Sequence, residues 1–252
     1  MYTIDDIINI LDILAPFEIS EEWDNVGILV GSKKCTVSKI MCVLDINESI
    51  LDEAISLQVD CIIAHHPFIF SALKKIDFES KEGSIIRKLI QNDITFIAMH
   101  TNLDKASGGI NDIICKNLGI NNPTVLHNFL RVGKIEPIDL EQLIQKVKKY
   151  FSANFIRVIG STTDKISTLS VCSGSGADFI KQASEVSQVY ITADVKFHEA
   201  QSALENNLIV LDVGHYNSEK IVIPVLCEYL KANLEDIDVI GTTISGEVFK
   251  IL

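Results

Sequence analysis

The feature that most constrains the fold is a repeated alternation of short apolar strands, rich in Ile and Val, with amphipathic helices. The expected strands cover residues 39–46, 60–65, 94–100, 166–172, 188–193 and 208–214, and the expected helices cover 47–58, 83–93, 110–118, 139–151, 177–186 and 224–234. Apolar strands separated by helices are typical of βαβ units around a mainly parallel sheet. The pattern therefore predicts an α/β protein.

One stretch interrupts this alternation. Residues 119–128, GINNPTVLHN, combine Gly, Asn and Pro, which are the residues that mark turns and loops. A chain of 252 residues is long enough for one large domain or two smaller ones. We therefore expect two α/β lobes with mainly parallel or mixed sheets. The first covers 1–126 and the second covers 127–252, and the final residues are candidates for packing back on the first lobe.

Composition argues against several classes of protein. The longest apolar runs, such as LIVL and CIIA, are far shorter than the roughly 18–20 residues that span a bilayer, so no membrane association is expected. The formal charge of −12 opposes broad binding to nucleic-acid phosphates or to anionic lipid surfaces. A nucleotide in a pocket remains compatible with this charge, because a metal centre can reverse the local field.

The cysteines and the N-terminus favour a cytoplasmic protein. The six cysteines are scattered without a C-x-x-C pair, which is typical of reduced buried thiols. The first twenty residues lack the basic leader and unbroken apolar segment of a secretory signal. Instead, Thr3 followed by Asp6 predicts a capped amphipathic helix.

Two adjacent histidines follow an expected strand in CIIAHHPFIF, residues 61–70. Side chains that are neighbours in an extended chain point to opposite sides, and Pro67 keeps His66 out of the helical region. The two imidazoles of His65 and His66 could therefore serve two separate metal positions. A surface turn explains the pair equally well when it is taken alone.

Further His and carboxylate pairs follow other strands. His100 and Asp104 lie in HTNLD after the strand at 94–100, and His215 and Glu219 lie in GHYNSE after the strand at 208–214. His100 and Asp104 could both turn back toward the same strand end, and one helical turn would bring His215 and Glu219, which are four apart, onto one face. A His with a carboxylate on such a turn suits Zn, Mn or Fe. For each pair a turn-forming or helix-start role remains open.

A last pair and a glycine-rich turn remain. Asp194 and His198, in ITADVKFHEA, could be ligands, partners of ligands, or part of a solvated helix face. The turn at 173–176 within CSGSGAD joins a strand to a helix, where backbone N–H groups can hold an anion, although a plain tight turn fits as well. Asn111 is expected to cap the following helix. Histidines gathered at strand ends predict a metal site, because sites in open α/β sheets form at that edge.

The ordered motifs resemble a known family. They are EEWDNVG (21–27), IIAHHPFIF (62–70), MHTNLDKASGGIND (99–112), SGSGADFI (173–180), ITADVKFHEA (191–200) and GHYNSE (214–219). The chain is similar in these segments to the NGG-interacting factor 3-like family, also known as type 2 GTP cyclohydrolase I homologues, in its short form. It departs from the family at Ala193, where relatives commonly carry glycine.

The resemblance implies a dinuclear metal centre in a cleft between the lobes and a ring-shaped homohexamer. The implied metal ligands are His65, His66, Asp104, His215 and Glu219. Glu219 would bridge the metals, while His100 and His198 are the candidate catalytic residues, as hydrogen-bond partners of the ligands or as substrate contacts. The two divalent ions could be Zn, Mn, Fe or Ni.

The expected function is a metal-dependent hydrolase acting on a small molecule, with a nucleotide as the leading candidate. The GTP cyclohydrolase I reaction would open the imidazole ring of guanine hydrolytically and release formate. One alternative keeps the metals but changes the substrate, for example to a phosphoester. Another alternative is a non-catalytic metal-binding regulatory or scaffold protein.

Overall fold

The computed structural model describes residues 1–250, which form two compact units. Unit 1 contains Met1–Ala106 together with the segment from Val222 onward, and unit 2 contains Ser107–Ile221. This division differs from the expected boundary between residues 126 and 127. Helix α5 (Ile110–Leu118) packs on strands of unit 2, whereas strand β13 (Asp238–Gly241) pairs with unit 1.

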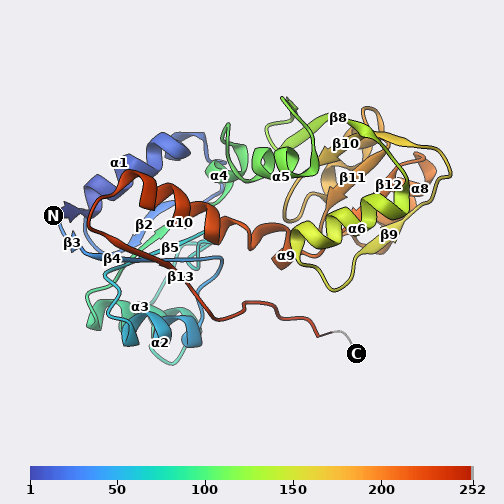
Figure 1. The fold of residues 1–252 in the computed structure, drawn as a ribbon. Coiled ribbons are helices and arrows are strands. Elements are labelled where there is room, and N and C mark those ends of the chain that lie inside the picture. Colours follow the sequence, from blue (N-terminus) through green and yellow to red (C-terminus); the bar gives the residue numbers. More distant parts are fainter. Residues whose placement is uncertain (251–252) are drawn as a thin grey trace. The chain divides into compact units, whose positions relative to one another are not determined.

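Unit 1 is built on a five-stranded mixed sheet (Figure 1). Its strands, in spatial order, are β13, β4 (Lys39–Val43), β5 (Cys61–Ala64), β6 (Thr95–Ala98) and β2 (Gly27–Val30). The first four strands are parallel, and β2 runs antiparallel to β6. The carboxyl ends of β4, β5 and β6 therefore meet at one edge of the sheet.

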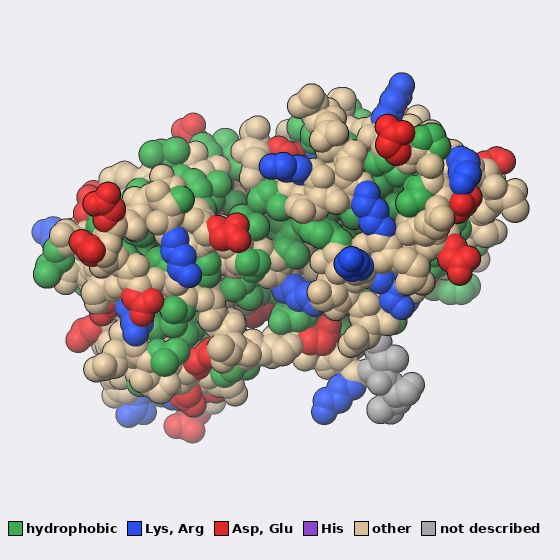
Figure 2. All heavy atoms as spheres, viewed as in Figure 1, with side chains coloured by type: hydrophobic (Ala, Val, Ile, Leu, Met, Phe, Trp, Pro, Cys, Tyr) green, Lys and Arg blue, Asp and Glu red, His purple; other side chains and the backbone are tan. Residues whose placement is uncertain are grey.

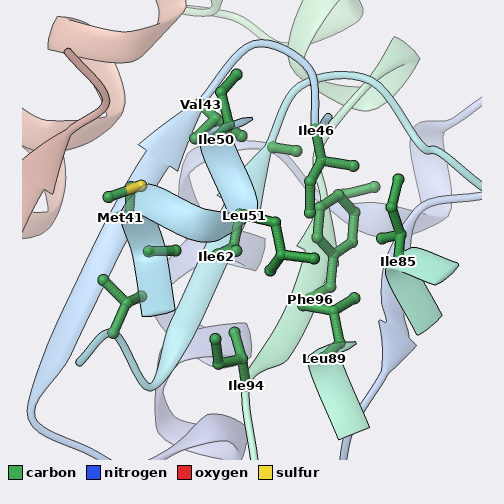
Figure 3. Packing of buried hydrophobic residues seen from close by; sticks show 14 residues of the cluster. Met41, Val43, Ile46, Ile50, Leu51, Ile62, Ile85, Leu89, Ile94 and Phe96 are labelled. Carbon is green, nitrogen blue, oxygen red and sulfur yellow. The ribbon is translucent and has the colours of Figure 1, made fainter. Parts of the chain in front are cut away.

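Two pairs of helices cover this sheet on its two faces (Figure 1). Helices α2 (Glu48–Ser56) and α3 (Lys81–Gln91) cover one face, and their apolar side chains form a core with the strands. Figure 3 shows Phe96 of β6 surrounded by Ile46, Leu51 and Leu89 in this core. On the other face, α1 (Ile4–Leu14) and α10 (Val222–Asn233) lie side by side, and the Tyr229 hydroxyl donates to the Ile10 carbonyl at 3.0 Å.

The beginning of α1 confirms a local prediction from the sequence. The Thr3 hydroxyl accepts from the Asp6 backbone N–H at 3.3 Å, and the Asp6 carboxylate accepts from the Thr3 backbone N–H at 2.8 Å. This reciprocal pair satisfies two N–H groups that the first helical turn leaves without helical partners. The helix directly follows β1 (Tyr2–Thr3), which pairs antiparallel with β3 (Thr36–Val37).

Unit 2 contains a six-stranded mixed sheet. Its strands, in spatial order, are β7 (Thr124–Leu126), β8 (Leu130–Ile138), β10 (Ile166–Val171), β11 (Val189–Thr192), β12 (Ile209–Asp212) and β9 (Arg157–Ile159). The central strands β10, β11 and β12 are parallel, and the outer pairings are antiparallel. The prediction of α/β units with mixed sheets is thus confirmed.

The helices of unit 2 pack in two pairs. Helices α5 and α6 (Leu140–Phe151) contact each other, as do α7 (Ile180–Ser184) and α8 (Phe197–Glu205). The expected helix at 177–186 is a 3₁₀ turn, η2 (Ala177–Phe179), followed by α7. Asn111 does not cap α5, because Gly109 occupies the cap and the Asn111 amide lies inside the helix.

Charged side chains of both signs lie on the surface. Acidic and basic side chains are interspersed on the face drawn in Figure 2. Within residues 1–250, no helix has the length and apolarity that crossing a bilayer requires.

Candidate metal centre

Three histidines gather at the carboxyl edge of the sheet in unit 1. His65 and His66 directly follow β5, and His100 follows β6 and precedes the short helix α4 (Thr101–Lys105). One ring nitrogen from each of the three lies within 4.8 Å of the others. Because β5 and β6 are parallel neighbours, their ends bring these side chains together. We call His65, His66 and His100 the histidine cluster.

The backbone keeps the adjacent histidines extended. The N–H groups of His65 and His66 donate to the carbonyls of Val43 and Leu44 at 3.2 and 2.9 Å, which prolongs the β4–β5 ladder. Their ring centroids lie 5.0 Å apart with the planes inclined at 43°. His65 is fully buried, and its Nδ1 lies 2.8 Å from the Met99 carbonyl oxygen.

The ring of His66 is oriented by a carboxylate at the end of the neighbouring strand. Its Nδ1 lies 2.8 Å from Oδ1 of Asp45, which follows β4. Asp45 is absent from the residues proposed from the sequence, because a lone Asp after a strand is also an ordinary turn residue. Only the parallel pairing of β4 with β5 brings it next to His66.

Asp104 joins the histidine cluster through one helical turn. Its N–H donates to the His100 carbonyl at 3.1 Å, so both residues project from the same turn of α4. Its Oδ1 lies 3.6 Å from Nε2 of His65. Nδ1 of His65 donates to the Met99 carbonyl, so Nε2 is the nitrogen that faces this carboxylate. An imidazole nitrogen and a carboxylate oxygen that face each other are suitable ligands for a cation.

Asp24 anchors His100 and is a second residue that the sequence did not single out as part of the site. It lies just before β2, whose antiparallel pairing with β6 brings it to the same edge. Its carboxylate accepts from Nδ1 of His100 at 2.9 Å and from the Thr101 N–H at 3.0 Å. Burial alone would raise the pKa of Asp24, but the hydrogen bonds from His100 and Thr101 outweigh burial and lower it to about 2. The carboxylate therefore stays ionised.

Unit 2 holds a second set of potential ligands, His215 and Glu219 on the short helix α9 (His215–Glu219) after β12. Nε2 of His215 lies 2.8 Å from Oε2 of Glu219, and Nδ1 lies 2.7 Å from Oδ2 of Asp194. Hydrogen bonds to Glu219 and to Asp194 outweigh burial and raise the pKa of His215 to about 9. In the metal-free protein a proton thus links His215 to Glu219. We call the potential ligands His215 and Glu219, together with Asp194, which orients His215, the unit 2 ligand set.

Gly174 permits the close packing of Glu219. Its φ is +62°, and a Cβ added there would lie 2.1 Å from Oε1 of Glu219. Its N–H donates to the Ser218 hydroxyl at 2.9 Å, and that hydroxyl donates to the His215 carbonyl at 2.8 Å. The loop after β10 and the turn of α9 are therefore locked together.

The glycine-rich turn uses its backbone donors internally. Besides the Gly174 N–H, the Ser173 N–H donates to the Asn111 amide oxygen at 2.8 Å, and the Gly176 N–H donates to the Gly174 carbonyl at 2.9 Å. These three N–H groups point at protein acceptors, which favours the tight-turn alternative over anion binding. Asn111 serves this turn rather than the start of its own helix.

In the segment after β11, Asp194 and His198 have different surroundings. Asp194 has a φ of +56° and orients His215, which makes it a partner of a potential ligand. Ala193 is buried, and its N–H donates to the Gly174 carbonyl at 3.1 Å. His198 is exposed, with Nδ1 2.9 Å from the Gln201 side-chain oxygen on the same helix. Its catalytic role stays a prediction.

One chemical feature is common to the four candidate imidazoles. Nδ1 of each lies within hydrogen-bond distance of an oxygen that can only accept: the Met99 carbonyl for His65, and the carboxylates of Asp45, Asp24 and Asp194 for His66, His100 and His215. Nδ1 must therefore carry the proton, and Nε2 becomes the nitrogen that can bind a metal. Metal-ligating histidines usually have such an anchored second nitrogen. The residues present thus fit divalent metal ions.

Comparison with known proteins agrees with the motifs. A model of the family described as Duf34/NIF3 (NGG1p interacting factor 3) matches residues 2–246. The chain is 32% identical over 240 residues to a protein of Clostridium acetobutylicum named GTP cyclohydrolase 1 type 2 homolog, covering 91% of this chain and 90% of that one. A protein of the same name from Streptococcus pneumoniae is 35% identical, with 84% of each chain covered.

Solved structures share the fold over nearly the whole chain. A hypothetical protein from Staphylococcus aureus superimposes with a TM-score of 0.90 at 26% identity, covering 99% of both chains. HcgD from Methanocaldococcus jannaschii superimposes with a TM-score of 0.87 at 28% identity, covering 96% of this chain and 98% of that one.

The contact between Gly174 and Glu219 can be tested with Gly174→Ala. The new Cβ would displace the Glu219 carboxylate, so we expect metal affinity to fall at least tenfold, as measured by equilibrium dialysis with elemental analysis. Gly108→Ala is the matched control, because Gly108 also has a positive φ, +77°, but nothing lies within 4 Å of its added Cβ. Both variants should lose roughly 1–2 kcal/mol of stability from the left-handed backbone. Equal metal affinity in the two variants would contradict the role assigned to Gly174.

The protonated state of His215 predicts that metal uptake releases a proton. Its pKa of about 9 means that the metal-free ring is charged at pH 7, whereas only a neutral imidazole binds a metal. Apparent affinity should therefore fall about tenfold for each pH unit below that pKa. Calorimetry in two buffers of different ionisation enthalpy measures the protons released. His215→Ala should release about one proton fewer at pH 7, and an unchanged number would refute this protonation state.

Proposed function

The chain belongs to the Duf34/NIF3 (NGG1p interacting factor 3) family, and on this basis we propose that it is a dinuclear metal-dependent hydrolase of the GTP cyclohydrolase I type. The observation that carries the proposal is the anchoring of four imidazoles through Nδ1 at strand ends. A surface histidine gains little from such an anchor, whereas a metal ligand needs it to fix both its tautomer and its orientation.

We propose that the histidine cluster and the unit 2 ligand set contribute to one dinuclear centre. The ligands would be His65, His66, Asp104, His215 and Glu219, as the resemblance implies. Each set by itself offers few side-chain donors for two ions, and the two sets supply the mixture of imidazole and carboxylate that suits Zn, Mn, Fe or Ni. Glu219 would be the bridging carboxylate.

Divalent metals, when bound, supply Lewis acidity and lower the pKa of water. The residues of this chain would prepare the site for that chemistry. Asp24, Asp45 and Asp194 hold three imidazoles in place, and the hydrogen bond to Asp24 fixes the orientation of the His100 ring. His100 would contact the substrate beside the metal ligands or complete their ligand set.

The substrate class rests on the names of the relatives. Several relatives are named GTP cyclohydrolase 1 type 2 homolog, and for this chain we propose hydrolytic opening of the guanine imidazole ring with release of formate. A phosphoester or other hydrolysable bond is the alternative that keeps the same site. A regulatory or scaffold role for the metal-binding protein is the alternative without catalysis. The hexameric ring implied by the resemblance, and the cytoplasmic location favoured by the cysteines and the N-terminus, stay predictions.

The shared centre can be tested through metal stoichiometry. Wild-type protein purified without chelators should hold about two ions per chain. If one centre uses both ligand sets, His66→Ala and Glu219→Gln should each weaken binding of both ions, and the double variant should lose less affinity than the sum of the single losses. His127→Ala is the control, because His127 is an exposed histidine outside both ligand sets. Additive losses confined to one ion per variant would contradict a shared centre.

Catalysis can be tested by incubating metal-loaded protein with GTP and with a panel of phosphoesters, scoring formate and phosphate separately. We expect formate from GTP, and a loss of at least a hundredfold in kcat for Asp104→Asn. Phosphate release from the panel without formate would favour the alternative hydrolase. Absence of both products, with full complementation of a deletion strain by a variant that cannot bind metal, would remove catalysis as the main role.

A further inference from the structure

A pair of exposed aromatic rings lies beside the histidine cluster in unit 1. Trp23, the single tryptophan of the chain, is 56% exposed, and Phe70 is 54% exposed. Their ring centroids are 5.7 Å apart and the planes are inclined at 44°. Scattered apolar residues on a surface need no explanation, but two large rings in contact next to potential metal ligands do. We call Trp23 and Phe70 the aromatic pair.

Polar contacts hold the backbone under both rings. Asp24, the neighbour of Trp23, is tied to His100 and Thr101 as described above. The Asn25 side-chain amide donates to the Ile69 carbonyl at 2.6 Å. This hydrogen bond connects the segment that contains Trp23 to the segment that contains Phe70. The backbone that carries the aromatic pair is thus held in place, although both residues are more than half exposed. Binding of a ligand would therefore cost little further conformational entropy in this segment, because it is already ordered in the free protein.

The aromatic pair is next to the potential ligand atoms. The Trp23 ring centroid lies 6.1 Å from that of His100, with the planes at 74°. The His100 ring in turn lies 5.4 Å from His65 and 5.5 Å from His66. The Trp23 ring is therefore in edge contact with a member of the histidine cluster.

We propose that Trp23 and Phe70 form a substrate subsite that stacks a planar heteroaromatic ring and presents it to the histidine cluster. A planar group stacked on the indole would be parallel to it, and so inclined at about 44° to the neighbouring Phe70 ring, which could add a tilted ring contact. The role of this subsite in a reaction rests on the proposed function. The subsite narrows the substrate class to compounds that carry a ring, as opposed to aliphatic esters or amides.

Because the chain has one tryptophan, its fluorescence reports directly on the subsite. Zinc-loaded protein is titrated with GTP, guanosine and inorganic tripolyphosphate, since zinc is a closed-shell ion without redox chemistry. Stacking should quench Trp23 with the two ring-bearing probes and leave the signal unchanged with tripolyphosphate. Phe70→Leu keeps the fluorophore and should weaken both ring-bearing probes.

Trp23→Leu removes the fluorophore, so its binding is measured by calorimetry. Stacking of a base on an aromatic side chain is worth roughly 1–3 kcal/mol, so guanosine and GTP should bind about 5- to 150-fold more weakly. Tripolyphosphate affinity and zinc content should match the wild type, which also shows that the variant is folded. Phe78→Leu is the matched control, because Phe78 is 51% exposed and lies against the Arg87 guanidinium instead of a histidine.

The outcomes separate the subsite from the reaction. Quenching by guanosine without formate release from GTP would keep the subsite and reject the cyclohydrolase reaction. Formate release with the same KM in wild type and Trp23→Leu would keep the reaction and overturn the subsite. Absence of quenching by both ring-bearing probes would also overturn it. A fluorescence change that follows protein concentration alone would assign the aromatic pair to a contact between copies of the chain and reject the proposal.

Discussion

The candidate centre depends on one repeated interaction, a hydrogen bond from Nδ1 of an imidazole to an oxygen at or near a strand end. Each bond fixes a tautomer, a ring orientation and the nitrogen that can bind a metal. Three of the four acceptors are carboxylates, which also increase the electron density on the ring. The site is therefore shaped as much by Asp24, Asp45 and Asp194 as by the histidines that they hold.

This interaction recurs because each unit uses the carboxyl edge of its own sheet. In unit 1 the ends of β4, β5 and β6 supply Asp45 and the histidine cluster, and in unit 2 the ends of β10, β11 and β12 supply Gly174 and the unit 2 ligand set. Neighbouring parallel strands end at one edge, so residues far apart in the chain meet there. The strands place the backbone rigidly, while the short segments that follow carry the chemistry.

The segment before β2 serves two purposes at once. Asp24 accepts a hydrogen bond from His100, and its neighbour Trp23 has an exposed ring beside that histidine. A buried, ionised carboxylate and an exposed indole are thus adjacent in the chain, at the end of a turn that the Asp24 N–H closes by donating to the Glu21 carbonyl at 3.0 Å. The same few residues therefore link the orientation of a potential ligand to the surface that we assign to substrate.

The sequence alone determined the α/β class, the capped first helix and the family, because these follow from local periodicity, short-range hydrogen bonds and ordered motifs. It also pointed to His65, His66, Asp104 and Glu219 as chemistry-bearing residues at strand ends. Only the tertiary structure decided which oxygen holds each imidazole, that Asn111 serves the glycine-rich turn, and that the chain returns to unit 1 through β13. These contacts join residues distant in the sequence, so they depend on strand order and pairing, which local patterns do not encode.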